Sequence, residues 1–276
     1  MIVDGNNVIS HFLKNNLPLC AGKIGVTELN LLYCHHNLVN AAKFLPHLQH
    51  EAEDIAGLFP YNKDTTTAFA EDMLSRLVTL DLIPKWNRVH PMFEKFIFDN
   101  YCKNAYITDL QHLEPYFFDK PWTDQLEGKT VLVISPFAES IERNYKNLDK
   151  IWNGKIKSNF TLKVLKYPFA LKISPNSNFT TSDEVYRYYL NALQQEKFDV
   201  CITGTGYTSL LLAAEAKKMG KAGIHLGGAT QILFGIKGQR WRDIKEFQPF
   251  FNEHWTDPIE SEKPEKRNLV EGACYW

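Results

Sequence analysis

The stretch FDVCITGTGYTSLLLAAEAKKMGKAGIHLGGATQILFGIKGQRW, residues 198–241, decides the fold of this chain. It opens with a short apolar run, Phe198 to Ile202, which predicts a buried strand. A glycine turn, Gly204-Thr205-Gly206, follows, and residues 209–219 then have helical periodicity. A second short apolar run, residues 222–226, leads to another pair of glycines. The order strand, glycine turn, helix, strand, glycine turn predicts a unit of an open α/β sheet.

These glycine turns suit the binding of an anion. Without a side chain, backbone N–H groups approach a ligand closely, and the N-terminus of the following helix adds positive potential. Ser209 stands where the full G-x-G-x-x-G pattern has its third glycine, so a plain strand-to-helix turn remains an open alternative. The cations Lys237, Arg240 and Arg242 follow among further glycines. They form either a segment that closes over a pyrophosphate or a solvated loop.

Composition excludes several classes of protein. The chain has 276 residues and a net charge of −1, which gives no basic field for non-specific nucleic-acid binding. Five scattered cysteines without a C-x-x-C pair predict neither a zinc site nor a disulfide framework. The chain has no run of 18 apolar residues and no basic start followed by an apolar stretch. We therefore expect a cytoplasmic protein without a transmembrane segment.

The second half of the chain predicts a Rossmann-like, mostly parallel sheet covered by helices. Residues 129–134 and 162–166 have the pattern of buried strands, and a helix is expected over residues 139–152. The capping box Thr181-Ser182-Asp183-Glu184 predicts a helix over residues 182–196. Gly220 and residues 222–226 are the expected helix end and next strand. We expect one domain, residues 1–276, with this core at residues 128–241 and an irregular segment at residues 242–276.

The first part, residues 1–127, is expected to be rich in helices. We predict a helix within residues 1–16, a strand at Leu17–Ala21 and a helix at Leu29–Asn40, and residues 40–104 have a mostly helical pattern. The aromatic stretch EPYFFDKPW, residues 114–122, is expected to be an ordered linker, with a sugar-stacking surface as the alternative.

Parallel sheets bind ligands beyond the carboxyl ends of their strands. That rule brings residues 25–28, 135–140, 204–209 and 225–228 to one edge of the predicted sheet. Glu28 is either an active-site carboxylate or a surface acid favoured by the N-terminus of its helix. His225 is either a site residue or a buried structural histidine.

Three motifs together resemble a family. They are GKIGVTEL at residues 22–29, LEPYFFDKPWTDQLEGKTVLVISPFAESI at residues 113–141, and the stretch at residues 198–241. This set resembles proteins encoded with capsule and surface-polysaccharide genes and, more distantly, glycosyltransferases of the GT-D fold. The resemblance implies transfer of a sugar from a nucleotide-sugar donor, a uridine diphosphate (UDP) sugar, to a glycan hydroxyl.

The resemblance also suggests how a metal is bound. The family motif reads Gly-Asp-Gly-Glu, and the matching residues here are Gly25, Val26, Thr27 and Glu28. Val26 replaces the aspartate, so Mn²⁺ or Mg²⁺ would need other ligands, because such ions take about six oxygens. Without a metal, protein donors must stabilise the leaving diphosphate.

The candidate residues follow from these arguments. Glu28 is the first candidate for general base and Asp81 is the second. The expected donor-binding residues are Lys23, Gly25, Thr27, Ser135, Pro136, Phe137, Ser140, Gly204, Thr205, Gly206, Tyr207, Thr208, His225, Gly227, Gly228, Lys237 and Arg240. Two alternatives stay open: a Rossmann-type nucleotide-dependent enzyme of another class, and a non-catalytic nucleotide- or sugar-binding protein. A Rossmann dinucleotide site would need its glycine motif after the first strand and an acid about 20 residues on, which this chain lacks.

Overall fold

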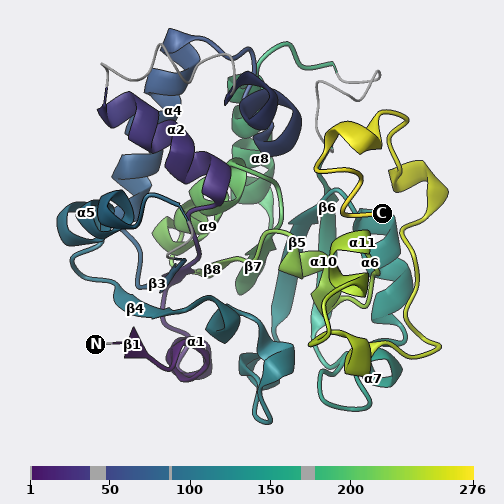
Figure 1. The fold of residues 1–276 in the computed structure, drawn as a ribbon. Coiled ribbons are helices and arrows are strands. Elements are labelled where there is room, and N and C mark those ends of the chain that lie inside the picture. Colours follow the sequence, from purple (N-terminus) through teal and green to yellow (C-terminus); the bar gives the residue numbers. More distant parts are fainter. Residues whose placement is uncertain (1, 38–47, 87–88, 169–177) are drawn as a thin grey trace.

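A computed structural model describes residues 2–37, 48–86, 89–168 and 178–276. Its centre is one eight-stranded sheet in which every pair of strands is parallel (Figure 1). The strand order is β1-β4-β3-β2-β8-β7-β5-β6. The strands are β1 (Ile2–Val3), β2 (Leu19–Ala21), β3 (Leu82–Lys85), β4 (Tyr106–Asp109), β5 (Thr130–Ser135), β6 (Thr161–Lys166), β7 (Val200–Thr203) and β8 (Ala222–His225). The prediction of a parallel α/β fold is confirmed.

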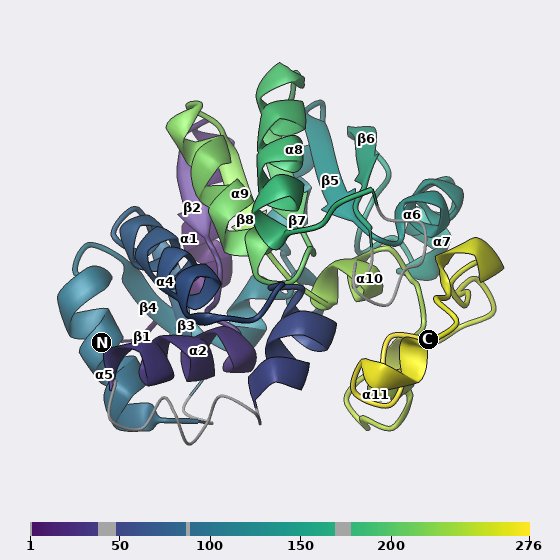
Figure 2. The same ribbon diagram turned by 90° about the horizontal axis from the view of Figure 1, so that it is seen from above.

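Helices cover both faces of this sheet (Figure 2). The α-helices are α1 (Gly5–Lys14), α2 (Val26–His36), α4 (Lys63–Leu77), α5 (Pro91–Tyr101), α6 (Ala138–Tyr145), α7 (Leu148–Ile151), α8 (Ser182–Gln195), α9 (Thr208–Lys218), α10 (Ala229–Leu233) and α11 (Gln239–Arg242). The remaining helical segments are one π-helix, η1 (Glu51–Ala56), and the 3₁₀-helices η2 (Leu110–Leu113), η3 (Pro115–Phe117), η4 (Trp122–Leu126), η5 (Gln248–Phe250), η6 (Glu260–Glu262) and η7 (Arg267–Leu269). None of the helices in the described parts of the chain is long and apolar enough to cross a membrane.

Each face of the sheet has its own hydrophobic core, and alternate residues of a strand contribute side chains to the two cores. In β5, Leu132 and Ile134 join the cluster that packs under α2, α4, α5, α8 and α9. Val131 and Val133 join the cluster under α1, α6, α7 and α10. Because successive side chains of a strand point to opposite faces, one apolar run fills both layers. This explains why β5 has no polar face in the sequence.

Several predicted elements are confirmed with small shifts in their ends. Helix α8 begins with the predicted capping box, in which the Thr181 hydroxyl accepts from the Glu184 amide at 3.2 Å. The helix expected over residues 139–152 is divided into α6 and α7. The helix expected over residues 29–40 begins earlier, at Val26, and its positions 38–40 lie outside the described residues.

The expectation of a mostly helical stretch at residues 40–104 was wrong in one respect, because β3 lies within it. Strand β3 has only four residues, and one of them is Pro84. The next strand in the sheet, β4, also has four residues, two of which are exposed, and the edge strand β1 has only two. Such strands lack the apolar alternation that marks a strand in sequence. The sheet therefore extends through the region that composition presents as helical.

Helix α9 lies against β8 without any space between them. An ideal Cβ on Gly223 of β8 would come within 2.0 Å of the Ala213 carbonyl oxygen. Nine residues of α9 are buried, including both Leu211 and Ala213. Glycine at position 223 is therefore required by the close approach of the helix backbone to the strand.

This contact leads to a stability prediction. Gly223→Ala should lower the free energy of unfolding by about 3 kcal/mol, the upper end of the usual cost of overpacking. Urea unfolding measures the change. The control is Gly220→Asn, at a left-handed position (φ 78°) with open space around it, where a cost below about 1 kcal/mol is expected. Equal stability of Gly223→Ala and the unmodified protein would contradict the proposed contact.

Candidate functional site

A pocket of about 870 Å³ lies beyond the carboxyl ends of the strands. It lies at the point where the strand order reverses, because β2 pairs with β8 and their connections leave toward opposite faces. The loop after β2 leads to α2 on one face, and the loop after β8 leads to α10 on the other. In parallel sheets, connections that diverge in this way leave a crevice between them. The volume of this pocket is within the range of typical ligand sites.

Most of the sequence-predicted site residues line this pocket. They come from the loops after β2, β5, β7 and β8 and from α11. They are Lys23, Gly25, Thr27, Glu28, Ser135, Pro136, Phe137, Gly204, Gly206, His225, Gly227, Gly228 and Arg240. The rule that ligand loops meet at the carboxyl edge therefore collected pocket residues as far apart in the chain as Gly25 and Gly228.

Aromatic side chains form much of the wall, and sequence analysis assigned only part of them. Trp86 follows β3, and Phe117 belongs to the aromatic stretch at residues 114–122. Trp241, Phe247 and Tyr275 come from the end of the chain. The sequence signal for Phe117 was the aromatic stretch at residues 114–122, which was expected to be an ordered linker, and Trp86 follows Pro84 by two residues. The last segment had no pattern that would place it at a site.

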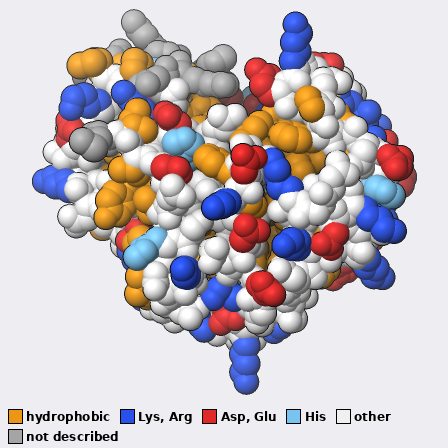
Figure 3. All heavy atoms as spheres, turned by 90° about the horizontal axis from the view of Figure 1, so that it is seen from below, with side chains coloured by type: hydrophobic (Ala, Val, Ile, Leu, Met, Phe, Trp, Pro, Cys, Tyr) orange, Lys and Arg blue, Asp and Glu red, His pale blue; other side chains and the backbone are white. Residues whose placement is uncertain are grey.

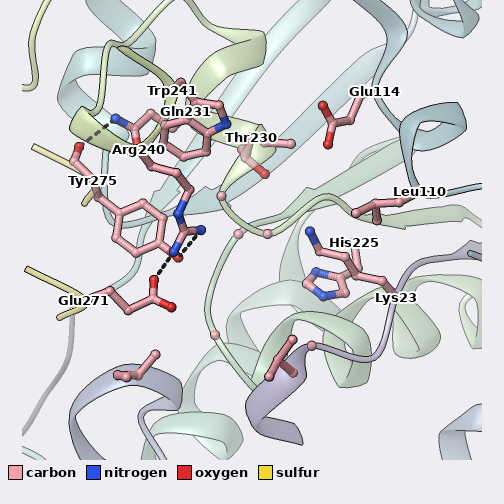
Figure 4. Close-up of a pocket in the computed structure, with 18 of the residues that line it drawn as sticks. Lys23, Leu110, Glu114, His225, Thr230, Gln231, Arg240, Trp241, Glu271 and Tyr275 are labelled. Carbon is pink, nitrogen blue, oxygen red and sulfur yellow. Dashed lines mark hydrogen bonds and ion pairs between the residues drawn. The ribbon is translucent and has the colours of Figure 1, made fainter. Parts of the chain in front are cut away.

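Lys23 is one of the cations that line the pocket. Its ammonium group lies 5.1 Å from the centre of the Trp86 ring. Its positive charge lowers the pKa values of three neighbouring groups, Glu28, Glu114 and His225, although burial is the larger influence on each of them. Figure 4 shows Lys23 beside His225, across the pocket from Arg240. The face of the molecule seen in Figure 3 has acidic and basic side chains interspersed.

The Glu28 carboxyl group lies at the N-terminus of α2, in its first turn. An ideal Cβ on Gly25, the residue that caps this helix, would come within 2.0 Å of Glu28 Oε2. Burial raises the pKa of Glu28, and its own backbone amide and Lys23 oppose that rise. The structure therefore places this acid both in the first turn of α2 and in the pocket lining.

A second acid in the pocket, Glu114, was missed as a site residue. Its Oε2 accepts a hydrogen bond from the Tyr116 hydroxyl at 2.5 Å. Burial raises the pKa of Glu114, while Tyr116 and Lys23 lower it. The pocket thus holds two carboxyl groups whose pKa values are raised toward the range useful for proton transfer.

His225 ends β8 and is buried, with 6% of its surface exposed. Burial lowers its pKa to about 3, the charge of Lys23 adds to that effect, and a backbone contact with Thr203 opposes it. The imidazole is therefore neutral at physiological pH, so it accepts or donates hydrogen bonds without adding charge.

The glycine loop after β7 differs from the expected anion cradle. The amides of Gly204 and Thr205 donate to Ile134 O and Ser209 Oγ, and the Tyr207 amide donates to Ala56 O at 3.1 Å. At most the amides of Gly206 and Thr208 are left for a ligand. The prediction that this whole run of amides grips a phosphate was therefore wrong.

Close packing explains these glycines better. A Cβ on Gly204 would come within 2.8 Å of Gly227 O, and one on Gly206 within 2.5 Å of Ala56 O. Gly206 also has a left-handed φ of 63°. The two glycine turns and residue 56 therefore touch one another, and this contact shapes the floor of the pocket.

Three hydroxyl groups expected at the donor site point into the protein. Thr205 and Thr208 hydrogen-bond to each other at 2.9 Å, and Thr205 also contacts the Ser209 hydroxyl at 3.1 Å. The Tyr207 hydroxyl donates to Ser182 O at 2.9 Å. All three residues are buried, and none lines the pocket. Tyr207 thus ties the start of α9 to α8, and the two threonines bond within the turn.

Two further predicted residues also lie away from the pocket. Ser140 is fully buried, and its hydroxyl donates to the Glu262 carboxylate. The Lys237 backbone binds Thr256 and Gln231, and its side chain is not part of the pocket lining. Their proximity in sequence to site residues led to the wrong expectation.

Asp81 was expected as the second candidate for general base, and its position rules this out. It immediately precedes β3, at the amino edge of the sheet opposite the pocket. Its carboxylate accepts from the Cys20 amide at 2.8 Å and from Lys217 Nζ at 2.7 Å. Asp81 is a structural acid that joins β2, β3 and α9.

The ionisable side chains in the described ranges include no group of three or more His, Cys, Asp or Glu arranged to hold a metal ion. Within the pocket, Glu28 and Glu114 are the acids that lie near Lys23. Val26, at the position of the family aspartate, also lines the pocket and supplies no oxygen ligand from its side chain.

The chain matches no protein-family model, no curated protein and no solved structure. Its function must therefore be inferred from the pocket and from the motifs themselves.

The neutral His225 predicts how stability depends on pH. In the unfolded chain histidine titrates near pH 6.5, and in the folded chain near pH 3. The unfolded state thus binds more protons below pH 6.5, so the folded state loses stability as pH falls. Between pH 7 and pH 5 this group alone should remove about 2 kcal/mol.

Urea unfolding of the unmodified protein and of His225→Gln at both pH values tests this. The variant should lose about 2 kcal/mol less over the interval. His254→Gln is the control, because His254 is half-exposed and lies outside the pocket lining. If His225→Gln and the unmodified protein show parallel pH profiles, His225 is not held neutral.

Proposed function

We propose that the protein is a glycosyltransferase that moves a sugar from a UDP-sugar donor to a glycan hydroxyl. One observation carries the proposal: the crevice between β2 and β8 holds Lys23, a carboxyl group with a raised pKa and a wall of aromatic rings. A cation suits a diphosphate, a carboxyl group suits proton transfer, and aromatic rings suit a base or a sugar. The resemblance of three motifs to the GT-D family agrees with this combination. A cytoplasmic location is part of the proposal.

Each part of the reaction has a candidate residue. The acceptor oxygen attacks the anomeric carbon of the donor, and the bond from that carbon to the diphosphate oxygen breaks. The leaving diphosphate keeps the electron pair, and Lys23 and Arg240 stabilise its growing negative charge. The acceptor hydroxyl gives its proton to the Glu28 carboxylate. The aromatic walls limit the access of water to the sugar.

Two cations can replace much of the charge that a divalent ion supplies. Each charge-assisted hydrogen bond contributes about 1.5–3 kcal/mol, so Lys23 and Arg240 together offset a large part of the diphosphate charge. Because Val26 stands at the position of the family aspartate, we expect weaker dependence on Mn²⁺ than the GT-D motif implies. Comparison of turnover with and without Mn²⁺ addresses this directly.

Donor binding should stabilise the folded protein. A UDP-sugar at about 100 times its dissociation constant adds about 2.7 kcal/mol, which raises the melting temperature by roughly 5–10 °C for a chain of this size. Thermal-shift measurements with several UDP-sugars, each with and without Mn²⁺, test this. Stabilisation by NAD or S-adenosylmethionine, with none by UDP-sugars, would instead favour a nucleotide-dependent enzyme of another class.

Glu28→Gln separates catalysis from binding. The variant keeps the size of the side chain and a hydrogen-bonding group at the helix terminus, but it cannot accept the proton. We expect turnover to fall at least about 100-fold, the lower range for general-base catalysis, with donor affinity changed only a few-fold. Activity assays and calorimetric titration with UDP give the two values.

Two further variants serve as comparisons for Glu28→Gln. Glu253→Gln is the matched control, because this glutamate is 82% exposed and lies outside the pocket lining. Glu114→Gln tests the second pocket acid. Turnover that survives in Glu28→Gln but is lost in Glu114→Gln would transfer the role of base to Glu114.

A further inference from the structure

The last residues of the chain form one wall of the pocket. We call residues 259–276 the strap. Its backbone carbonyls bind the two short helices beside the pocket: Cys274 O accepts from the Arg240 amide at 3.0 Å, and Tyr275 O accepts from Gln231 Nε2 at 2.7 Å. These bonds fix the strap against α11 and α10, and they bring Glu271 and Tyr275 into the pocket lining.

Two carboxylates of the strap bind donor groups of the neighbouring helices α6 and α11, and these two carboxylates differ in their exposure to solvent. Glu262 is 5% exposed and accepts hydrogen bonds from the amides of Glu139 and Ser140 at the start of α6. It is a permanent part of the fold. The Glu271 side chain is 41% exposed and forms an ion pair with Arg240. An ion pair so exposed to water contributes little to stability, so it exchanges readily with another anion.

Arg240 is positioned by more than this ion pair. Its guanidinium carbon lies 5.0 Å from the centre of the Tyr275 ring and 5.7 Å from that of Trp241. Figure 4 shows the four side chains gathered on one side of the pocket, with Glu271 at the end of Arg240. Since two aromatic rings lie within 6 Å of the guanidinium carbon, they limit the movement of the side chain and favour a position from which its N–H groups reach an anion that replaces Glu271.

We propose that Glu271 is an exchangeable internal counter-ion of Arg240, and that its carboxylate occupies the place of a ligand phosphate group. The ligand class is a diphosphate, free or as part of a nucleotide, which rests on the proposed function. Binding of such a ligand transfers Arg240 from the carboxylate to the phosphate. Glu271 therefore lowers the affinity of the pocket for anions and screens Arg240 when the pocket is empty.

Calorimetric titration with inorganic pyrophosphate tests the exchange. Glu271→Gln should bind pyrophosphate about threefold to fivefold more tightly than the unmodified protein, the range that an exposed ion pair supplies. Arg240→Met should bind it at least about tenfold more weakly. In the double variant, Glu271→Gln should give no gain, because its effect depends on Arg240.

Two controls separate exchange from a general change of charge. Glu246→Gln removes another exposed carboxylate from the pocket lining. Asp257→Asn breaks an ion pair with Arg242, which lies on the same helix as Arg240 but outside the lining. Neither should tighten pyrophosphate binding more than about 1.5-fold, as expected for screened charges. An equal gain in Glu246→Gln and Glu271→Gln, or no gain in Glu271→Gln, would overturn the proposal. So would the absence of pyrophosphate binding to every variant.

The outcomes also distinguish this inference from the proposed function. If the pyrophosphate pattern is as expected but no UDP-sugar binds, the anion site stands and the glycosyltransferase proposal fails. If UDP-sugars bind and turn over while Glu271→Gln leaves pyrophosphate affinity unchanged, the enzyme proposal stands and the exchange proposal fails.

Discussion

The pairing of β2 with β8 is the constraint on which the rest of the molecule depends. It joins a strand near the start of the chain to one more than 200 residues later, in the register Leu19↔Ala222 to Ala21↔Ile224. The register places Lys23, two residues after β2, near His225 at the end of β8. An ideal Cβ on Gly22 would lie 2.7 Å from the His225 Cβ, so the two connections separate only after this contact. The crevice and the low pKa of His225 follow from the same pairing.

The sequence predicted elements whose signal is local, and it failed where the deciding interaction is distant. The capping box at Thr181 and the apolar run of β5 define their own elements. The strand β3 cannot be recognised in isolation, because four residues that include Pro84 form a strand only between β2 and β4. The position of Asp81 also depends on distant contacts, because this residue lies at the amino end of β3, and β3 forms only when it pairs with β2 and β4. Its ion pair with Lys217 joins residues that are 136 positions apart.

The glycine turn shows a different limit of sequence analysis. The spacing of the glycines correctly predicted the strand, the turn and the helix, but it did not predict the hydrogen-bond partner of each polar group. In the folded chain the hydroxyl groups of Thr205 and Thr208 satisfy each other, and the amide of Tyr207 meets Ala56 from η1. Buried polar groups in proteins are almost always hydrogen-bonded, and here the hydrogen-bond partners are other groups of the protein, so these groups are not available to a ligand. In the proposed site, an anion would therefore be bound by the side chains around the turn instead of by the turn's amides.

That shift changes the electrostatic problem of the site. Cations at Lys23 and Arg240 face four pocket acids, two of which, Glu28 and Glu114, have pKa values raised by burial. A polyanionic ligand gains from the cations but is repelled by each ionised acid. Raised pKa values reduce this repulsion, because an anion brought near a carboxyl group raises its pKa further and favours uptake of a proton. In the proposed reaction, ligand binding and proton uptake would thus be coupled, and an acid that is protonated when the charged donor binds must release that proton before it can act as base. For Glu28 the helix N-terminus favours that release, since its positive potential stabilises the carboxylate. Under the proposed mechanism, the position of Glu28 in the first turn of α2 therefore helps it to accept a proton beside an anionic ligand.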